Sequence, residues 1–289
     1  MKIVLLTGAA GDVASHLRRE LAGRYSFRLS DLQAIRQLGP GETFCRADLG
    51  SLPQLLKATK GVDAIVHLGG MRTEAPWPAI LRGNLLGVYN LFEAARRNRV
   101  KRIVFASSNH ATGFYRRDQR IDDTVYPKPD SRYGLSKVFG EQVGFLYAQK
   151  AGIAVFNIRI GNVTPAPRDK RRLSNWLSPR DCAQLVAIGL DHPDIQFEIV
   201  YGVSGNTRSF YDNSNAHRLG YRPQDNSEPF AAEILKREPP PLDARVEVYQ
   251  GGAFVVAGDT VPGDEPPPVP RARRRKAKRT ASKAKRKKR

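Results

Sequence analysis

Short apolar runs alternate with helix-like segments over the first 160 residues, and this alternation constrains the fold more than any other feature of the chain. The apolar runs cover residues 2–7, 26–31, 42–46, 63–68, 101–107 and 153–160. Apolar strands separated by helices are typical of a parallel sheet with both faces covered. The pattern therefore predicts an α/β fold, a doubly wound parallel sheet of the Rossmann type, with a small C-terminal substrate lobe.

A glycine-rich turn follows the first apolar run, and the helix-like segment 13–21 begins directly after it. A strand, a tight glycine turn and a helix N-terminus together form a cradle for pyrophosphate. Gly8 allows the turn, Gly11 allows close backbone approach, and Ala14 is small enough for the third position of the motif. An ordinary βα turn is the alternative. The dinucleotide contacts predicted in this turn are Gly8, Ala10, Gly11, Asp12 and Val13.

Asp31 ends the second apolar run, at about the 20-residue distance expected of a ribose-binding carboxylate. A carboxylate there accepts hydrogen bonds from the ribose 2′-hydroxyl and repels a 2′-phosphate. The sequence therefore predicts NAD rather than NADP, although Arg28 and Arg36 lie nearby. After the third run, Asp48 and Leu49 are predicted to contact the adenine, and Asp48 could equally cap the next helix.

Tyr133 and Lys137 lie four residues apart in a helix-like segment. Because positions i and i+4 share one face of a helix, the phenol and the ammonium can point into one cleft. We expect the ammonium to lower the pKa of Tyr133 from about 10 toward neutrality. The pair predicts a proton-transfer site, although the same spacing also occurs by chance on solvated helices.

Polar side chains follow the fifth apolar run, at the end of the sheet where open parallel folds bind ligands. Ser108 is the candidate to hold a substrate hydroxyl, but spacing alone does not separate it from Ser107. Asn109 and His110 are candidates for substrate contact or orientation.

The fourth apolar run ends in Leu68, Gly69 and Gly70. We expect these three residues to contact the cofactor. The two glycines are small enough for the nicotinamide half of the cofactor to approach closely, or they simply allow the chain to turn. Asn84 begins a buried-looking helix over residues 84–95, and we expect it either to cap that helix or to brace the active site.

These segments resemble the extended short-chain dehydrogenases/reductases, the NAD-dependent epimerase/dehydratase family, and within it the bacterial uronate dehydrogenases. The resemblance runs from about residue 1 to residue 257 and is carried by residues 7–11, 65–70, 104–110, 133–137, 159–161 and 250–255. It implies an NAD-dependent enzyme that oxidises the C1 hydroxyl of glucuronate or galacturonate to an aldarolactone. It also implies a homo-oligomer.

The resemblance implies a role for each matching residue. Tyr133 would be the general base, Lys137 its pKa-lowering partner and ribose contact, and Ser108 would orient the C1 hydroxyl. Asn109 and His110 would touch the sugar. Ile160, within residues 159–161, would contact the cofactor.

The basic loop 168–172 would face the sugar carboxylate through Arg171, because a guanidinium grips a carboxylate with two parallel hydrogen bonds. The sequence does not separate Arg171 from Arg172, and a solvated surface cluster is the alternative. Arg72 and Asn162 stand where the family has serines. Both are expected near the bound sugar as substrate contacts, so the reaction class is better specified than the substrate.

Two other functions remain open at this point. The first is a nucleotide-sugar epimerase or dehydratase that retains NAD, against which the short C-terminal region argues. The second is an NAD-binding module whose basic tail binds nucleic acid.

The net charge of +20 is concentrated at one end of the chain. Residues 271–289 hold 13 of the 48 Lys and Arg residues, so the remainder carries 35 against 28 acidic residues, or +7. A segment of Lys, Arg and Ala cannot bury a core and is predicted to be disordered. It could bind nucleic acid or another polyanion through counterion release, or serve as a solubilising appendage.

Three regions follow from these patterns: an NAD-binding core at 1–160, a substrate-binding lobe with C-terminal elements at 161–257, and a disordered proline-rich linker with a basic tail at 258–289. No apolar run reaches the length of about 18 residues expected of a membrane span, and no secretory signal opens the chain. Cys45 and Cys182 are too few for a disulfide framework or a zinc site. We expect no metal and a cytoplasmic location.

Overall fold

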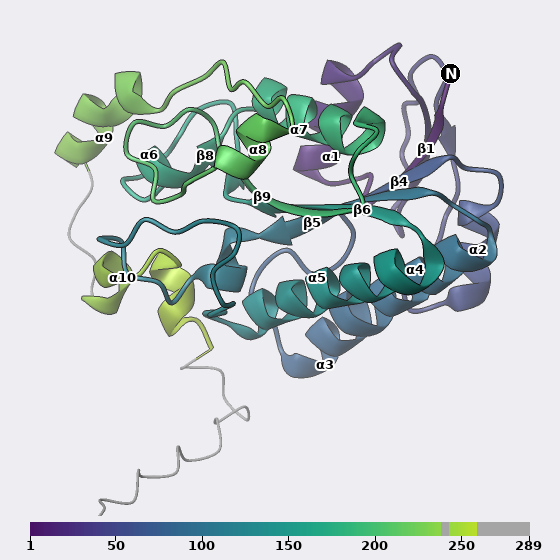
Figure 1. Ribbon diagram of the computed structural model, residues 1–289, viewed down its shortest axis with the longest axis horizontal. Helices are drawn as coiled ribbons and strands as arrows, with labels where there is room; N and C mark the ends of the chain where they lie inside the picture. The colour runs from purple at the N-terminus through teal and green to yellow at the C-terminus, as the bar shows by residue number, and fades with distance from the viewer. Residues whose placement is uncertain (238–242, 259–289) are drawn as a thin grey trace, which may run out of the picture.

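The computed structural model describes residues 1–237 and 243–258. Seven strands form one sheet in the order β3-β2-β1-β4-β5-β6-β9, and every pairing in it is parallel (Figure 1). The predicted doubly wound fold is confirmed. The strands are β1 (Ile3–Thr7), β2 (Ser26–Ser30), β3 (Thr43–Phe44), β4 (Ala64–His67), β5 (Arg102–Ser108), β6 (Ala154–Ile160) and β9 (Phe197–Gly202).

Helices cover both faces of the sheet, as Figure 1 shows. On one face lie α1 (Asp12–Glu20), α7 (Pro179–Asp191) and α8 (Ser214–Arg218), and on the other lie α2 (Leu52–Thr59), α4 (Gly87–Arg97) and α5 (Arg132–Ala151). Successive strand residues point to opposite faces, so Leu6 joins the first core and Leu5 the second. This alternation within fully buried strands explains why the apolar runs are continuous.

Helix α5 is held close against the sheet and presents its N-terminal turn to the carboxyl ends of the strands. Ser131 caps it, because its Oγ accepts a hydrogen bond from the Gly134 nitrogen at 3.0 Å. Gly140 lies so near the Phe105 ring that a Cβ atom there would collide with it. The fit of α5 on β5 therefore fixes the height of Tyr133 and Lys137 above the sheet.

Short elements complete the described chain. They are α3 (Trp77–Ile80), the π-helical turn η1 (Leu81–Leu86), η2 (Asn109–Thr112), β7 (Asn162–Val163), α6 (Arg172–Asn175), β8 (Trp176–Leu177), η3 (Glu228–Phe230), α9 (Ala231–Arg237), α10 (Arg245–Val248) and η4 (Gly252–Val256). Trp176 is buried and donates its Nε1 hydrogen to the Thr164 carbonyl at 2.7 Å. Phe210 packs partly buried against Tyr211. Both side chains therefore pack within the protein.

The part of the chain after residue 160 contributes to the main sheet as well as to the lobe. Helix α7 and strand β9 complete it, and β9 pairs with β6. The predicted boundary at residue 160 stays a prediction. The predicted linker and basic tail lie outside the described residues, apart from Gly258.

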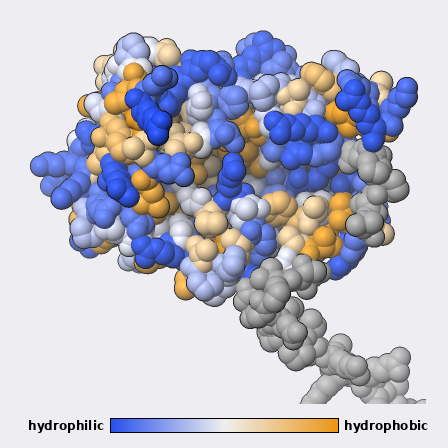
Figure 2. All heavy atoms as spheres, turned by 180° about the vertical axis from the view of Figure 1, so that it is seen from behind, coloured by the Kyte–Doolittle hydropathy of each residue, from blue (hydrophilic) through white to orange (hydrophobic). Residues whose placement is uncertain are grey.

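Within the described ranges, no helix combines the length and apolar character needed to cross a membrane. Hydrophilic and apolar residues alternate in small patches over the face shown in Figure 2.

Candidate active site

A cavity of about 710 Å³ opens where β1, β4, β5 and β6 end. It runs from the turn at Gly8 and Gly11, past Ser108 and Tyr133, to Arg171. From β1 the chain adds β2 and β3 on one side of the sheet, and it then crosses over to add β4 on the other side. Open parallel sheets bind ligands where the strand order switches in this way. The fold therefore brings the predicted dinucleotide turn and the predicted proton-transfer pair to one cavity.

The glycine turn has the geometry that a pyrophosphate cradle needs. Gly8 has φ +69°, and a Cβ atom there would lie 2.8 Å from the Gly69 nitrogen. Asp12 and Val13, the first residues of α1, line the cavity, so the helix N-terminus faces it. These residues fit the diphosphate of a dinucleotide. Position 8 requires glycine for two reasons, the positive φ angle and the lack of space for a Cβ atom.

Asp31 lies beside this turn rather than on the cavity wall. Its Oδ2 accepts a hydrogen bond from the Ala10 nitrogen at 3.1 Å, and its Oδ1 accepts one from the Gln33 nitrogen at 3.0 Å. The carboxylate at the end of β2 is thus held next to the glycine turn, as the dinucleotide motif requires.

Several predicted cofactor contacts do not line the cavity as the structure describes it. Asp48 accepts the Gly50 nitrogen at 2.8 Å and pairs with Arg82, while Ser51 is the residue that precedes α2. The N-cap alternative for Asp48 is therefore wrong. Leu49 packs against Gly69, and a Cβ atom on Gly69 would lie 3.0 Å from the Leu49 Cδ1 atom.

Asn84 is a brace inside the protein. Its Oδ1 accepts the Met71 nitrogen at 2.7 Å, and its Nδ2 donates to the Met71 carbonyl at 3.1 Å and to Ser136 Oγ at 2.8 Å. A side chain on Gly70 would collide with the Asn84 amide, so Gly70 serves this junction. Asn84 thus ties the loop after β4 to the first turns of α5. It is neither a helix cap nor a wall of the cavity.

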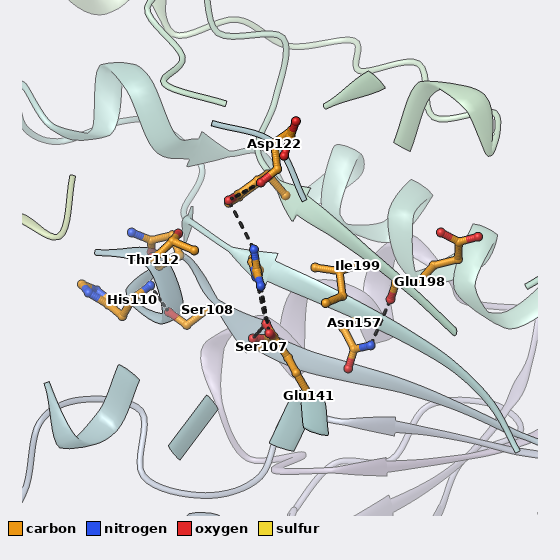
Figure 3. A network of polar contacts seen from close by, with 12 residues as sticks. Ser107, Ser108, His110, Thr112, Asp122, Glu141, Asn157, Glu198 and Ile199 are labelled. Atoms are coloured by element: carbon orange, nitrogen blue, oxygen red, sulfur yellow. Dashed lines mark hydrogen bonds and ion pairs between the residues drawn. The ribbon is translucent and has the colours of Figure 1, made fainter. Parts of the chain in front are cut away.

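Tyr133, Lys137 and Ser108 come together as predicted. The Lys137 Nζ atom lies 5.4 Å from the Tyr133 ring centre and donates to the Ala106 carbonyl at 2.9 Å. Ser108 and Tyr133 line the same cavity, and Ser108 lies near enough to the phenol to lower its pKa. Ser107 instead donates to Glu141 Oε1 at 2.5 Å, behind the site (Figure 3). The geometry therefore separates the two serines and favours Ser108.

The predicted lowering of the Tyr133 pKa is wrong for the protein as described. The pKa of Tyr133 is raised to about 12. Burial is the main cause and the negative charge of Asp130 adds to it, whereas Ser108 lowers the pKa. Burial also lowers the pKa of Lys137 to about 8, opposed by Glu141. Desolvation disfavours both charged forms, and it dominates because both side chains are enclosed.

A buried ion pair supports the catalytic helix from behind. Glu141 lies one turn beyond Lys137, and its carboxylate accepts Arg159 Nε at 2.9 Å and Nη2 at 3.0 Å. The side chains of Arg159 and Glu141 are 2% and 0% exposed. The pair joins α5 to β6 beneath Ser107, where Figure 3 shows Glu141 and Ser107 meeting.

Arg168, Arg171 and Arg172 line the far end of the cavity, and the protein orients Arg171 from the side. Its Nε donates to the Gln250 carbonyl at 2.7 Å, and burial lowers its pKa. Arg172 is occupied by Asn162, whose Oδ1 lies 2.8 Å from its Nε, and by Asp169. The structure therefore favours Arg171 over Arg172 and gives Asn162 a protein partner.

Asn109 is placed differently from the prediction. It is fully buried, and in the amide orientation that satisfies both ends it accepts Arg171 Nη2 at 2.6 Å and donates to the Ile160 carbonyl at 3.1 Å. It contacts Arg171 from beneath and does not form the cavity wall. Ile160 itself lines the cavity.

Arg72 lines the cavity, and its contact with the sugar stays a prediction. Its Nη1 pairs with Asp12 Oδ2 at 3.1 Å, with the two side chains 84% and 83% exposed. This contact places the Arg72 guanidinium at the glycine turn, whereas Arg171 contacts Gln250.

Residues 249–256, which we call the C-terminal strap, close the end of the cavity that lies beside Arg171 and His110. The Phe254 ring stacks 3.7 Å from the His110 ring, and Gly252, with φ +62°, leaves room for the Arg171 side chain. Residues 250–255 were among the segments that carry the family resemblance, but the sequence predicted no role for Phe254.

Asp130 and Glu74 were also missed. Asp130 Oδ2 lies 2.7 Å from His110 Nδ1, and Glu74 Oε2 accepts the Tyr133 backbone nitrogen at 2.8 Å. No local pattern links either acid to its partner, because the contacts are made across loops. The proline and serine around Asp130 were the one available signal, and they indicate only a helix start.

Comparison with known proteins identifies the family of the chain. A model of the NAD dependent epimerase/dehydratase family matches residues 4–194. A uronate dehydrogenase of Pseudomonas putida is 46% identical over 257 residues, which cover 88% of this chain and 96% of the relative. The structure of glucuronic acid dehydrogenase from Chromohalobacter salexigens has a TM-score of 0.86 at 43% identity, covering 89% of this chain and 97% of that one. A uronate dehydrogenase mutant from Agrobacterium tumefaciens, complexed with NAD, has a TM-score of 0.84 at 41% identity, covering 88% and 97%.

Proposed function

The chain belongs to the NAD-dependent epimerase/dehydratase family, and on that premise we propose that it oxidises the C1 hydroxyl of a hexuronic acid, glucuronate or galacturonate, to the aldarolactone. Its cofactor is NAD. The observation that carries the proposal is one cavity that joins the Gly8 turn, the Ser108–Tyr133–Lys137 group and Arg171. The names of the relatives support the choice of substrate class.

The reaction needs a base, an orienting hydrogen bond and a stabilising charge. The C1 hydroxyl hydrogen-bonds to Ser108 and Tyr133, and the Tyr133 phenolate takes its proton. Lys137 stabilises that phenolate through its charge, and a well-placed proton acceptor contributes about 10²–10⁴-fold to the rate. NAD, when bound, accepts the hydride that leaves C1, so the sugar loses one hydride and one proton and becomes the lactone.

Arg171 binds the sugar carboxylate in this proposal. Arg171 is partly buried, and Asn109 and the Gln250 carbonyl orient its guanidinium. A preoriented guanidinium loses little conformational freedom when it grips a carboxylate. His110 reaches the same end of the cavity and contacts a sugar hydroxyl.

The remaining expectations stay proposals. We infer a homo-oligomer, supported by apolar side chains such as Tyr89 and Phe145 that α4 and α5 leave 48% and 47% exposed. Light scattering of the full chain tests this. The three-region division, the cytoplasmic location and polyanion binding by the basic tail also stay predictions. For the location, both cysteines are free, as a reducing compartment requires.

The test is NADH formation by the purified chain with NAD and four sugars: glucuronate, galacturonate, glucose and galactose. Turnover on the two acids alone supports uronate oxidation with a cation on the carboxylate. Equal turnover on the neutral sugars contradicts the role of Arg171. Absence of turnover on all four, with NAD retained through purification, favours the nucleotide-sugar epimerase.

A further inference from the structure

A buried acid lies directly behind the sugar end of the cavity. The Asp130 side chain is 0% exposed, and its Oδ2 lies 2.7 Å from His110 Nδ1. Its Oδ1 accepts the Ser131 hydroxyl at 2.8 Å. A buried carboxylate is costly unless donors satisfy it, and here an imidazole N–H and a hydroxyl do so.

Glycines from three separate segments make room for this carboxylate. A Cβ atom on Gly113 or on Gly251 would collide with the Asp130 side chain. One on Gly134 would collide with the His110 carbonyl and lie 3.2 Å from Asp130 Oδ1. The loop after η2, the start of α5 and the C-terminal strap therefore all fit around one acid.

The His110 ring is fixed on its faces as well as at Nδ1. Phe254 stacks on one face at 3.7 Å between ring centres, and Tyr133 meets the ring edge to face at 5.9 Å. The backbone nitrogen of His110 donates to Ser108 Oγ at 3.2 Å. The ring lines the cavity, and its Nε2 takes no hydrogen bond from the residues that the structure describes.

The chemistry of the pair determines which ring nitrogen carries the proton. An ionised carboxylate only accepts hydrogen bonds, so Nδ1 of His110 must donate. Burial lowers the pKa of His110, which favours the neutral ring. In a neutral ring protonated at Nδ1, the Nε2 atom has a free lone pair.

We propose that Asp130 is a positioning residue that holds neutral His110 in the Nδ1-protonated tautomer, so that Nε2 accepts a hydrogen bond from a sugar hydroxyl. The sugar contact rests on the proposed function, whereas the tautomer does not. The carboxylate has a second effect, because its negative charge disfavours the phenolate of Tyr133 in the same site. The other charged groups that face Tyr133 and His110 are Lys137, Glu74 and Arg171.

The first test reads the tautomer without substrate. The full chain is labelled with ¹⁵N-histidine, and the His110 signals among the five histidines are assigned by their loss in His110→Gln. At neutral pH we expect the ¹⁵N shifts of an Nδ1-protonated, neutral ring. An Nε2-protonated ring or an imidazolium overturns the proposal. Because no sugar is involved, this outcome is distinguishable from failure of the proposed function.

The second test separates the hydrogen bond from the charge. Asp130→Asn keeps an oxygen that accepts from Nδ1, so the tautomer stays and the sugar KM changes by less than about threefold. Below the break that Lys137 sets, its kcat/KM should exceed that of the wild type at each pH, because Tyr133 loses a negative neighbour and its pKa falls. Asp130→Leu removes the acceptor as well, and we expect mixed tautomer signals and a sugar KM about tenfold higher.

NAD affinity, measured by calorimetry, is the folding control for both variants. A purely structural role for Asp130 would lower kcat/KM of Asp130→Asn at every pH, and that result contradicts the proposal. If Asp130→Leu does not fold, the Asn variant and the wild-type tautomer decide the question.

Discussion

The ammonium of Lys137 lies 5.4 Å from the centre of the Tyr133 ring, yet it donates a hydrogen bond to the Ala106 carbonyl. Lys137 therefore acts on Tyr133 through its charge. The active form of the pair is a phenolate beside an ammonium. Burial opposes both charges, with the pKa of Tyr133 at about 12 and that of Lys137 at about 8.

These two pKa values predict the pH dependence of the reaction. Below about pH 8 only Tyr133 titrates toward the active form, so kcat/KM should rise about tenfold per pH unit. Above about pH 8 the loss of charge on Lys137 cancels the gain, and the profile should level off. Initial rates across pH check this, and a flat profile below the break contradicts it. In Lys137→Met the break should disappear and the rise continue at a lower rate.

Tyr133→Phe should remove most turnover and leave NAD binding nearly intact. The phenol is the proton acceptor, so the expected loss in kcat is about 10²–10⁴-fold. Calorimetry with NAD and NADH formation measure the two effects. Tyr147→Phe is the matched control, because Tyr147 lies on the same helix and donates to Glu93 at 3.1 Å. Equal losses in both variants would point to damage to α5.

Arg171→Lys should raise the KM for a uronate by about 10- to 100-fold, because a lysine keeps the charge but loses the bidentate grip. The KM for NAD should stay within about threefold. Arg172→Lys is the control, since its partners Asp169 and Asn162 can accept from an ammonium. A larger rise of the uronate KM in Arg172→Lys than in Arg171→Lys would show that Arg172, and not Arg171, binds the carboxylate.

Arg72→Ser should weaken NAD binding by about three- to tenfold at low salt and leave the KM for the sugar unchanged. The guanidinium contacts Asp12 on the glycine turn, where it lies next to the expected diphosphate. Both side chains are exposed, so salt should screen the effect. Titrations at two ionic strengths check this. A changed sugar KM with unchanged NAD affinity would return Arg72 to the sugar.

Glu141→Gln should lower the free energy of unfolding by about 3–5 kcal/mol, because it leaves the buried Arg159 without a counter-charge. Urea unfolding measures the loss. The double variant Glu141→Leu with Arg159→Met should lose much less, since replacing both partners removes the unpaired charge. If the two variants were equally unstable, packing rather than charge would explain the effect.

The sheet could be predicted from the sequence because fully buried strands leave a continuous apolar signal. The six predicted runs match β1 to β6 to within two residues at each end. Strand β9 carries Glu198 and was grouped with the substrate lobe, since its place beside β6 depends on a tertiary contact. Tyr133, Lys137, Ser108 and the turn at Gly8 were found because local spacing or strand ends determine their position.

The remaining site residues depend on contacts between distant segments. Asp130 faces His110 across a loop of 20 residues, and Arg171 meets the Gln250 carbonyl 79 residues later. The pKa of Tyr133 was misjudged because the sequence shows the ammonium but not the desolvation. The contact of Arg72 with Asp12 was not predicted, because Asp12 lies 60 residues earlier in the chain.

The C-terminal strap has a consequence for synthesis of the protein. A growing chain that had emerged as far as residue 237 would contain the Gly8 turn, Tyr133 and Lys137, and thus the parts that recognise the dinucleotide. It would lack Phe254 against His110 and the Gln250 carbonyl that orients Arg171. Dinucleotide affinity should therefore mature on the ribosome before sugar affinity, and chains that stall near the end should sequester the dinucleotide without turning it over.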